Sequence, residues 1–319
     1  MLGITPVISV LGIMGNMFSI LILTKHGLQK CSNILLLSLA GNDVLYLIGF
    51  NSIPKLLYEV AACEEGFHYN HDVSHLLFYL HHIFHNIDYA CSSTSLTLPM
   101  LITFERLFAV FLPMKFHRFV TPCRTWFAVA LVNISWAAYF IHMSFLATFT
   151  YDYNPRLNMS VGLITRSAYF YDHSQMVVIL EGVMTYLIVQ IPPFVTMAGC
   201  VVIAIKVKVA SVQRKRLTLQ NKKCAALSRT TRTLLAVCMV YTFTCAVLNL
   251  PNYIPEYMYN SMVSDAPSNL GRVLYQVMSL ALCLNSSCNF VVYVVMNKNF
   301  RTTHIAMFAC KHQPRCTSA

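Results

Sequence analysis

The stretch NILLLSLAGNDVLYLIGFNSIPKLL, residues 33–57, is 25 residues long and almost entirely apolar. As a helix that rises 1.5 Å per residue, it is longer than the hydrocarbon core of a bilayer, which is about 30 Å thick. We therefore read it as a transmembrane span. Six further apolar stretches of this kind predict spans at about 3–24, 76–111, 125–150, 175–207, 231–258 and 269–296.

The composition supports insertion of the whole chain into a membrane. Hydrophobic residues make up 56% of the sequence and charged residues 11%, whereas roughly one quarter of the residues in soluble domains are charged. We find no internal repeat and no second soluble domain, so residues 1–319 are expected to form a single domain. The sequence predicts an all-α membrane protein built as a bundle of seven transmembrane helices.

The positive charges are concentrated between and after the predicted spans. Nineteen of the 23 lysine and arginine residues lie in the first-to-second, third-to-fourth and fifth-to-sixth connections and in the tail. Such segments face the cytoplasm under the positive-inside rule, so we expect an extracellular N-terminus and a cytoplasmic C-terminus. Because the basic residues do not line one soluble face, the net charge of +11 indicates contact with anionic membrane lipid and not with nucleic acid.

The acidic residues show the opposite distribution, since most of them lie in or near the outer segments. An acidic mouth attracts a cationic ligand by its electrostatic field. Ordinary solvated loop charge is the alternative for any single acid.

Two sequence features concern the outer segments. Asn158-Met159-Ser160, between the fourth and fifth spans, matches the glycosylation sequon, so Asn158 is an expected acceptor. Of the twelve cysteines only Cys63 falls in an outer loop, so no internal disulfide is expected there. The first span begins almost at Met1, and no cleavable signal peptide is expected.

Two carboxylates lie within the predicted spans. Asp43 is near the middle of the second span, and Asp88 is in the outer half of the third. A charge at membrane depth costs several kcal/mol and is usually paired or functional. These two positions are therefore candidates for a site.

Each predicted span, or the segment next to it, contains a short distinctive motif. The motifs are Gly15-Asn16, Leu37-Ser38-Leu39-Ala40-Gly41-Asn42-Asp43, Glu105-Arg106-Leu107, Pro113-Met114-Lys115-Phe116, Trp136, Pro192-Pro193, Pro251, Asn289-Phe290-Val291-Val292-Tyr293 and Asn299-Phe300-Arg301. Together they resemble the motifs of the rhodopsin-like (class A) G-protein-coupled receptors over essentially the whole chain. Asn285-Ser286-Ser287 looks most like invertebrate neuropeptide receptors of the FMRFamide type, and a divergent chemosensory receptor fits equally well.

The resemblance implies a plasma-membrane receptor with a short amphipathic eighth helix at about 298–309. It also implies an allosteric sodium ion, with Asp43 as its charged metal ligand, and no other cofactor. The residues that match the family's sodium pocket are Asp43, Ser95, Asn285, Ser286 and Asn289. A polar cluster filled by water, without a specific ion, is the alternative.

The resemblance further assigns coupling to a heterotrimeric G protein to Glu105, Arg106 and Tyr293. In the family, the arginine is released from its acidic neighbour on activation, and the inner part of the sixth span moves outward. An interfacial ion pair whose side chains extend towards the headgroups is the alternative reading of Glu105 and Arg106.

Asp88 matches a family position that often pairs with a basic group of the ligand. It precedes Arg106 by eighteen residues, or five helical turns, so the two share one helix face about 27 Å apart. Glu181 and Glu256, near the outer ends of the fifth and sixth spans, are expected to add to the same pocket. A structural bond from Asp88 to a neighbouring helix is the alternative.

Several positions depart from the family pattern. His81 stands where a cysteine is usual, and residues 151–180 contain no cysteine, so the fourth-to-fifth loop is expected to be less constrained. Asn249 occupies the usual switch-tryptophan position, and Phe290 replaces the usual proline. These departures indicate a divergent receptor.

The function expected is therefore a receptor for a cationic neuropeptide or a small cationic chemosensory cue. A transporter or channel is the alternative, although paired interrupted helices and repeated halves are not evident. No enzymatic activity is expected. A zinc site among the histidines near the outer end of the third span is a weaker possibility, against histidines that simply follow pH.

Overall fold

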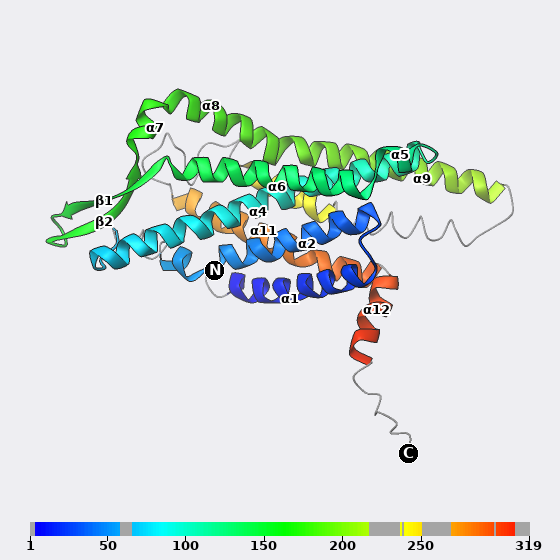
Figure 1. Ribbon diagram of the computed structural model, residues 1–319, viewed down its shortest axis with the longest axis horizontal. Helices are drawn as coiled ribbons and strands as arrows, with labels where there is room; N and C mark the ends of the chain where they lie inside the picture. Colours follow the sequence, from blue (N-terminus) through cyan, green and yellow to red (C-terminus); the bar gives the residue numbers. More distant parts are fainter. Residues whose placement is uncertain are drawn as a thin grey trace, which may run out of the picture.

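The computed structural model describes residues 4–57, 66–216, 237, 239–250, 269–296 and 298–309. Long helices lie side by side along the length of the molecule (Figure 1). The main helices are α1 (Ile4–Lys25), α2 (Cys31–Phe50), α4 (His71–Phe111), α6 (Pro122–Ser144), α8 (Ser174–Thr185), α9 (Ile191–Arg216), α11 (Asn269–Met296) and α12 (Lys298–Ala309). Short helices α5 (Phe116–Phe119) and α7 (Ala168–Asp172), the π-helix η1 (Tyr186–Gln190) and the strands β1 (Ala147–Asn154) and β2 (Met159–Arg166) complete the described elements.

Within the described part, six helices are long and apolar enough to cross a membrane, and the continuous helix Ser174–Val209 is one of them. The shorter apolar helix Met239–Leu250 belongs to the predicted span 231–258. The rest of that span lies outside the described residues, apart from Val237. Helix α12 follows α11 and turns away from the bundle (Figure 1). The predicted class, a helical membrane bundle with a short eighth helix, is confirmed.

Helix α1 distributes its apolar and polar side chains as a helix in a lipid bilayer does. Most of its buried positions are small or polar, such as Ser9, Gly12 and Asn16, although Ile22 and Leu23 are buried near its end. The large apolar side chains Leu11 and Met14 are more than half exposed. Lipid solvates these exposed apolar side chains, and the small buried residues allow close helix contact. At Gly12 an added Cβ atom would lie 2.1 Å from Ser287 Oγ, so α1 and α11 approach closely there.

Helix α4 lies at the centre of the bundle and contacts α2, α6 and α9. Leu98 of α4 packs with Leu39 of α2 and Val129 of α6 in one buried cluster. Trp136 Nε1 of α6 donates a hydrogen bond to Thr97 Oγ1 at 3.2 Å. These contacts fix the helix that carries Asp88, Glu105 and Arg106.

The segment after α6 is a β-hairpin. The predicted span 125–150 is wrong at its end, because the helix stops at Ser144 and β1 begins at Ala147. The prediction that this connection is less constrained is also wrong, because β1 pairs with β2 along its whole length. Phe67 exchanges backbone hydrogen bonds of 2.8 and 3.0 Å with Gly162 of β2, which attaches the hairpin to the segment before α4.

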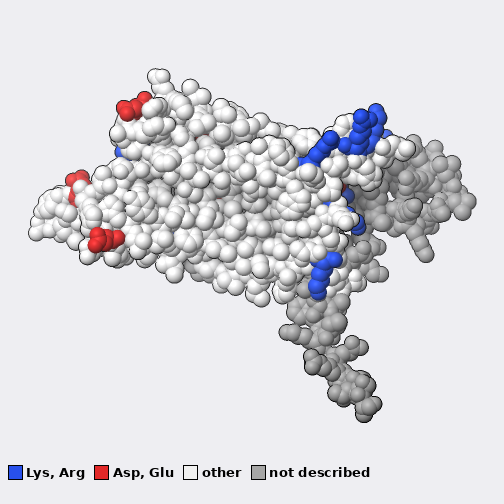
Figure 2. Space-filling view, in the orientation of Figure 1, with Lys and Arg blue, Asp and Glu red and all other residues white. Residues whose placement is uncertain are grey.

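The two ends of the bundle differ in charge. On the face shown in Figure 2, lysine and arginine gather at the end where α4 reaches Arg106, and aspartate and glutamate gather at the end that carries the hairpin. We call these the basic end and the hairpin end. The distribution agrees with the charge asymmetry of the sequence.

Candidate functional site

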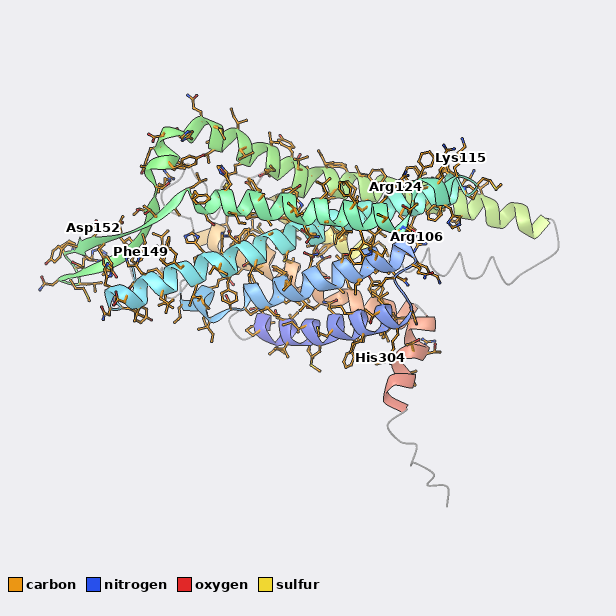
Figure 3. The ribbon with its side chains drawn as sticks, viewed as in Figure 1. Arg106, Lys115, Arg124, Phe149, Asp152 and His304 are labelled. Atoms are coloured by element: carbon orange, nitrogen blue, oxygen red, sulfur yellow. The ribbon has the colours of Figure 1, made fainter. Side chains whose placement is uncertain are left out.

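Glu105 and Arg106 form an ion pair near the basic end of α4, where Figure 3 also shows Lys115 and Arg124. Arg106 Nε lies 3.1 Å from Glu105 Oε2. The Glu105 side chain is 7% exposed and that of Arg106 is 27% exposed, so the arginine remains accessible from the basic end. Separating the pair leaves a buried carboxylate without its counter-charge, which is costly.

Tyr293 of α11 is buried near the same end. It packs with Ile22 of α1, Val237 of the sixth span and Phe300 of α12, and its ring centroid lies 5.8 Å from that of Phe300. Tyr293 therefore joins four helical segments at the level where α12 leaves the bundle. The structure places it and Arg106 at the same end, on different helices.

Asp43 lies in the middle of the bundle and is fully buried. Asn289 Nδ2 of α11 donates a hydrogen bond of 2.8 Å to Asp43 Oδ2. The hydroxyl groups of Ser95 and Ser286 also face this carboxylate. Asn285 is buried one residue before Ser286, and no hydrogen bond from it to Asp43 is present among the described residues.

Two buried oxygen atoms of this cluster, Asp43 Oδ1 and Ser95 Oγ, have no hydrogen-bond partner in the described part of the chain. Unsatisfied oxygens are rare in buried positions because each one has lost its hydration. A carboxylate with neutral oxygen donors is the ligand set that a hard cation prefers. These residues fit a sodium site in which Asp43 supplies the negative charge.

Asp88 is paired with Lys55, a residue that the sequence reasoning missed. The Lys55 ammonium group donates to Asp88 Oδ2, and the two side chains are 6% and 2% exposed. Lys55 Nζ also lies 4.3 Å from the ring centroid of Phe50 and 5.5 Å from that of Tyr89. The charge of Asp88 is thus neutralised by Lys55, and the rings of Phe50 and Tyr89 lie beside the lysine.

The local chain course explains how Lys55 reaches Asp88. Helix α2 ends at Phe50, and Asn51 Nδ2 donates to the Leu47 carbonyl at 2.9 Å and to Ser9 Oγ at 2.7 Å. A separate helical turn that contains Pro54 follows and carries Lys55. At Gly49 an added Cβ atom would lie 3.1 Å from the Asp88 backbone nitrogen, so α2 approaches α4 closely at this level.

A sequence signal for Lys55 does exist. It is one of four basic residues outside the basic segments, together with Arg156, Arg166 and Arg272. It lies within a predicted span, at about the depth of Asp88. Because intramembrane charges are usually paired, a lysine and an aspartate at one depth are expected partners.

The other two acids predicted for the ligand pocket are not seen with Asp88. Glu181 is half-buried on α8. Glu256 lies outside the described residues. In the described part of the chain, Asp88 pairs with Lys55 of the helical turn after α2 and lies against Gly49 of α2.

The hairpin end is rich in aromatic and histidine rings. His71 of α4 stacks on Tyr151 of β1 at 5.3 Å, and His75 meets Phe149 at 4.9 Å, so the hairpin lies against the first turns of α4. Among the described residues, no group of three His, Cys, Asp or Glu side chains is placed to hold a metal ion, which gives the zinc alternative no support. Asn158 is exposed at the hairpin turn with φ of 50°.

The described residues thus form a membrane-spanning helical bundle with a basic end, a buried polar core and an acidic residue paired to arginine. The family model described as "Serpentine type 7TM GPCR chemoreceptor Srw" matches residues 3–311, and the chain belongs to this family. The resemblance to class A receptors is thereby confirmed, and the family favours a receptor over the transporter or channel alternative.

Individual relatives are receptors as well. The chain is 25% identical to the FMRFamide receptor of Drosophila melanogaster over 313 residues, which is 95% of this chain and 52% of that receptor. It is 24% identical to the histamine H2 receptors of Homo sapiens and Pongo pygmaeus over 285 residues, which is 89% of this chain and 72% of theirs. The chain thus spans about half the length of the FMRFamide receptor. The family and these relatives are receptors and not enzymes.

The buried pair leads to a stability prediction. Lys55→Met and Asp88→Asn each leave one buried charge or donor without its partner, so each is expected to lower the free energy of unfolding by about 3–5 kcal/mol. The double variant is expected to recover most of this loss, because it removes both groups. Thermal denaturation of the purified protein in detergent measures all three.

Asp72→Asn is the matched control, since Asp72 is 96% exposed and its pairing distance to His71 is 3.5 Å. It is expected to leave the denaturation temperature unchanged. Additive losses in the double variant would show that Lys55 and Asp88 do not stabilise the fold as a pair.

Proposed function

We propose that this chain is a plasma-membrane receptor that binds an extracellular ligand with a cationic group and activates a heterotrimeric G protein. In this proposal the hairpin end is extracellular and the basic end is cytoplasmic, where its lysine and arginine residues also meet anionic lipid. The observation that carries the proposal is the ion pair between buried Glu105 and partly exposed Arg106, on the helix that also holds buried Asp88. One rigid element thus joins the two faces.

The proposed ligand site is centred on Asp88. A ligand cation reaches this carboxylate by taking the place of the Lys55 ammonium group, so Lys55 competes with the ligand. The rings of Phe50 and Tyr89, which now face Lys55, would contribute cation–π attraction to the incoming group. Glu181 and Glu256 are proposed as further acidic contacts. One relative is named for an amidated peptide and another for histamine, a small amine, so both ligand kinds stay within the proposal.

The proposed mechanism is allosteric and involves no covalent step. A ligand shifts the population of active receptor only by the difference between its affinities for the active and inactive packings. Separation of Glu105 and Arg106 and outward movement of the inner sixth span would open the basic end to the G protein. The hinge expected at Pro251 lies outside the described residues.

A sodium ion is proposed as an allosteric ligand of the inactive packing. Asp43, Ser95, Ser286 and Asn289 would hold it, with Asn285 nearby on the same helix. The ion would supply the positive charge that the buried carboxylate lacks, and its loss would allow α2, α4 and α11 to repack. Asn158 is proposed as a glycosylation site on the exposed hairpin turn.

The primary test is a screen of amidated peptides and amines on cells that express the chain, read by calcium and cyclic AMP. Arg106→Ala is expected to abolish the response to any agonist found and to leave its binding measurable, because Arg106 lies at the basic end, about 27 Å from Asp88. Arg156→Ala, on the hairpin, is the control and should signal normally. Full signalling by Arg106→Ala at equal surface expression would refute the assignment.

The ligand assignment is tested with a cationic agonist from the same screen. Asp88→Asn is expected to weaken it about 30-fold or more, as removal of one partner of a desolvated pair does. Lys55→Gln is expected to strengthen it, because the competing ammonium group is gone. The potency of an uncharged agonist should be unchanged by either substitution. Equal potency of the cationic agonist on wild type and Asp88→Asn would show that the ligand charge is recognised elsewhere, with Glu181 and Glu256 the next positions.

The sodium assignment is tested by agonist affinity in sodium chloride and in choline chloride. Sodium is expected to lower agonist affinity of the wild type, because it binds the inactive packing, and Asp43→Asn should remove this dependence. Asp152→Asn on the hairpin serves as the control and should keep it. A sodium effect that survives in Asp43→Asn would place the ion at another site.

A further inference from the structure

The helix Met239–Leu250 presents one sharply defined face to the bundle. Tyr241 and Cys245 are each 1% exposed, whereas Met239 and Phe243 are 68% and 71% exposed. Residues four apart share a helix face, so Tyr241, Cys245 and Asn249 form one row about 12 Å long. The row packs with Leu96 of α4 and with Ile188 and Val189 of η1.

Two polar side chains of this row bond to the main chain of neighbouring helices. Tyr241 Oη donates to the Leu96 carbonyl of α4 at 2.6 Å. Asn249 Nδ2 donates to the Val189 carbonyl of η1 at 3.0 Å and to the Cys245 carbonyl of its own helix at 2.8 Å. The sixth span is thus attached to the third span at one level and to the fifth span at another.

The backbone of the fifth span is irregular at this point. In a regular α-helix the Val189 carbonyl accepts from the amide of residue 193, but residue 193 is proline and has no N–H group. The π-helix Tyr186–Gln190 lies immediately before Pro192-Pro193 and widens the backbone there. Asn249 Nδ2 donates to the Val189 carbonyl, to which Pro193 cannot donate.

The third span has a related irregularity. Pro99 lies inside α4, so the carbonyl four residues earlier, at Ser95, lacks its usual amide donor. Leu96, the acceptor for Tyr241, is the next residue. Both acceptors therefore lie in helix turns that proline loosens, and both donors come from the same face of the sixth span.

We propose that Tyr241 and Asn249 are positioning residues that hold the sixth span in the inactive packing by these two bonds. The inference rests on the proposed function, because it assigns the bonds to the resting state in which Glu105 and Arg106 are paired. Outward movement of the basic end of the span must break the Tyr241 bond to α4 and strain the Asn249 bond to η1. Removing either donor favours the moved position even without ligand.

The test uses Tyr241→Phe, which removes one oxygen and keeps the ring, and Asn249→Leu, which removes the donor at similar volume. Nucleotide exchange on purified G proteins is measured without ligand, at equal receptor amounts. Each variant is expected to raise basal exchange about 2- to 10-fold, which is the effect of one buried hydrogen bond on an equilibrium. Tyr139→Phe removes the same oxygen from α6, outside the row, and should leave basal exchange unchanged.

A second readout measures the movement without a G protein. Spin labels are placed on the exposed native Cys123 at the start of α6 and on Met239→Cys, after Cys63, Cys224, Cys238, Cys288, Cys310 and Cys316 are replaced by serine. Tyr241→Phe and Asn249→Leu are expected to increase the population with the longer label distance.

The outcomes separate the two proposals. A longer distance without exchange on any G protein supports the two bonds as a restraint and contradicts the proposed coupling. An unchanged distance, or basal exchange that falls as a merely structural defect would cause, overturns the proposal for Tyr241 and Asn249.

Discussion

Within hydrocarbon a polar group has no water to bond, so each buried donor, acceptor and charge must find its partner inside the protein. This constraint organises the bundle at three levels of α4. Near the hairpin end Asp88 is neutralised by Lys55, in the middle Asp43 bonds to Asn289, and near the basic end Glu105 pairs with Arg106. The first two partnerships join different helical segments. They therefore hold these segments together and also give each buried carboxylate a partner.

In the proposed function the same partnerships are the points at which the bundle would switch. A buried pair is costly to break by removing one member, but one member can be exchanged for another group of the same charge. A ligand cation at Asp88 and the G protein at Arg106 would each act by such an exchange, whereas a sodium ion at Asp43 would add the positive charge that Asn289 does not supply. Because α4 carries or contacts all three levels, we expect a shift at one of them to alter the packing at the others. Coupling of this kind is reciprocal between sites.

Much of this arrangement follows from the sequence, since hydropathy predicts the spans and charge asymmetry separates the two ends. The neighbouring residues Glu105 and Arg106 and the motif around Asn289 also predict contacts that the structure contains. Lys55 was not predicted, because its pairing depends on the break after Phe50 and on close approach at Gly49. The hairpin was missed because alternating residues such as Thr148, Phe149 and Thr150 were included in an apolar span. The Asn249–Val189 bond was not predicted, because it depends on which helices lie next to each other and on the irregular backbone before Pro193. Neither can be read from the sequence around Asn249.

The most direct test of the account is the effect of a G protein on agonist affinity. The strongest agonist from the peptide and amine screen would be labelled, and its dissociation constant measured on the purified receptor in lipid nanodiscs, with and without nucleotide-free G protein. Reciprocal coupling between the hairpin end and the basic end predicts tighter binding with the G protein and loss of the gain when a non-hydrolysable GTP analogue is added. An affinity that is the same in all three conditions would contradict the claim that the two ends are energetically linked.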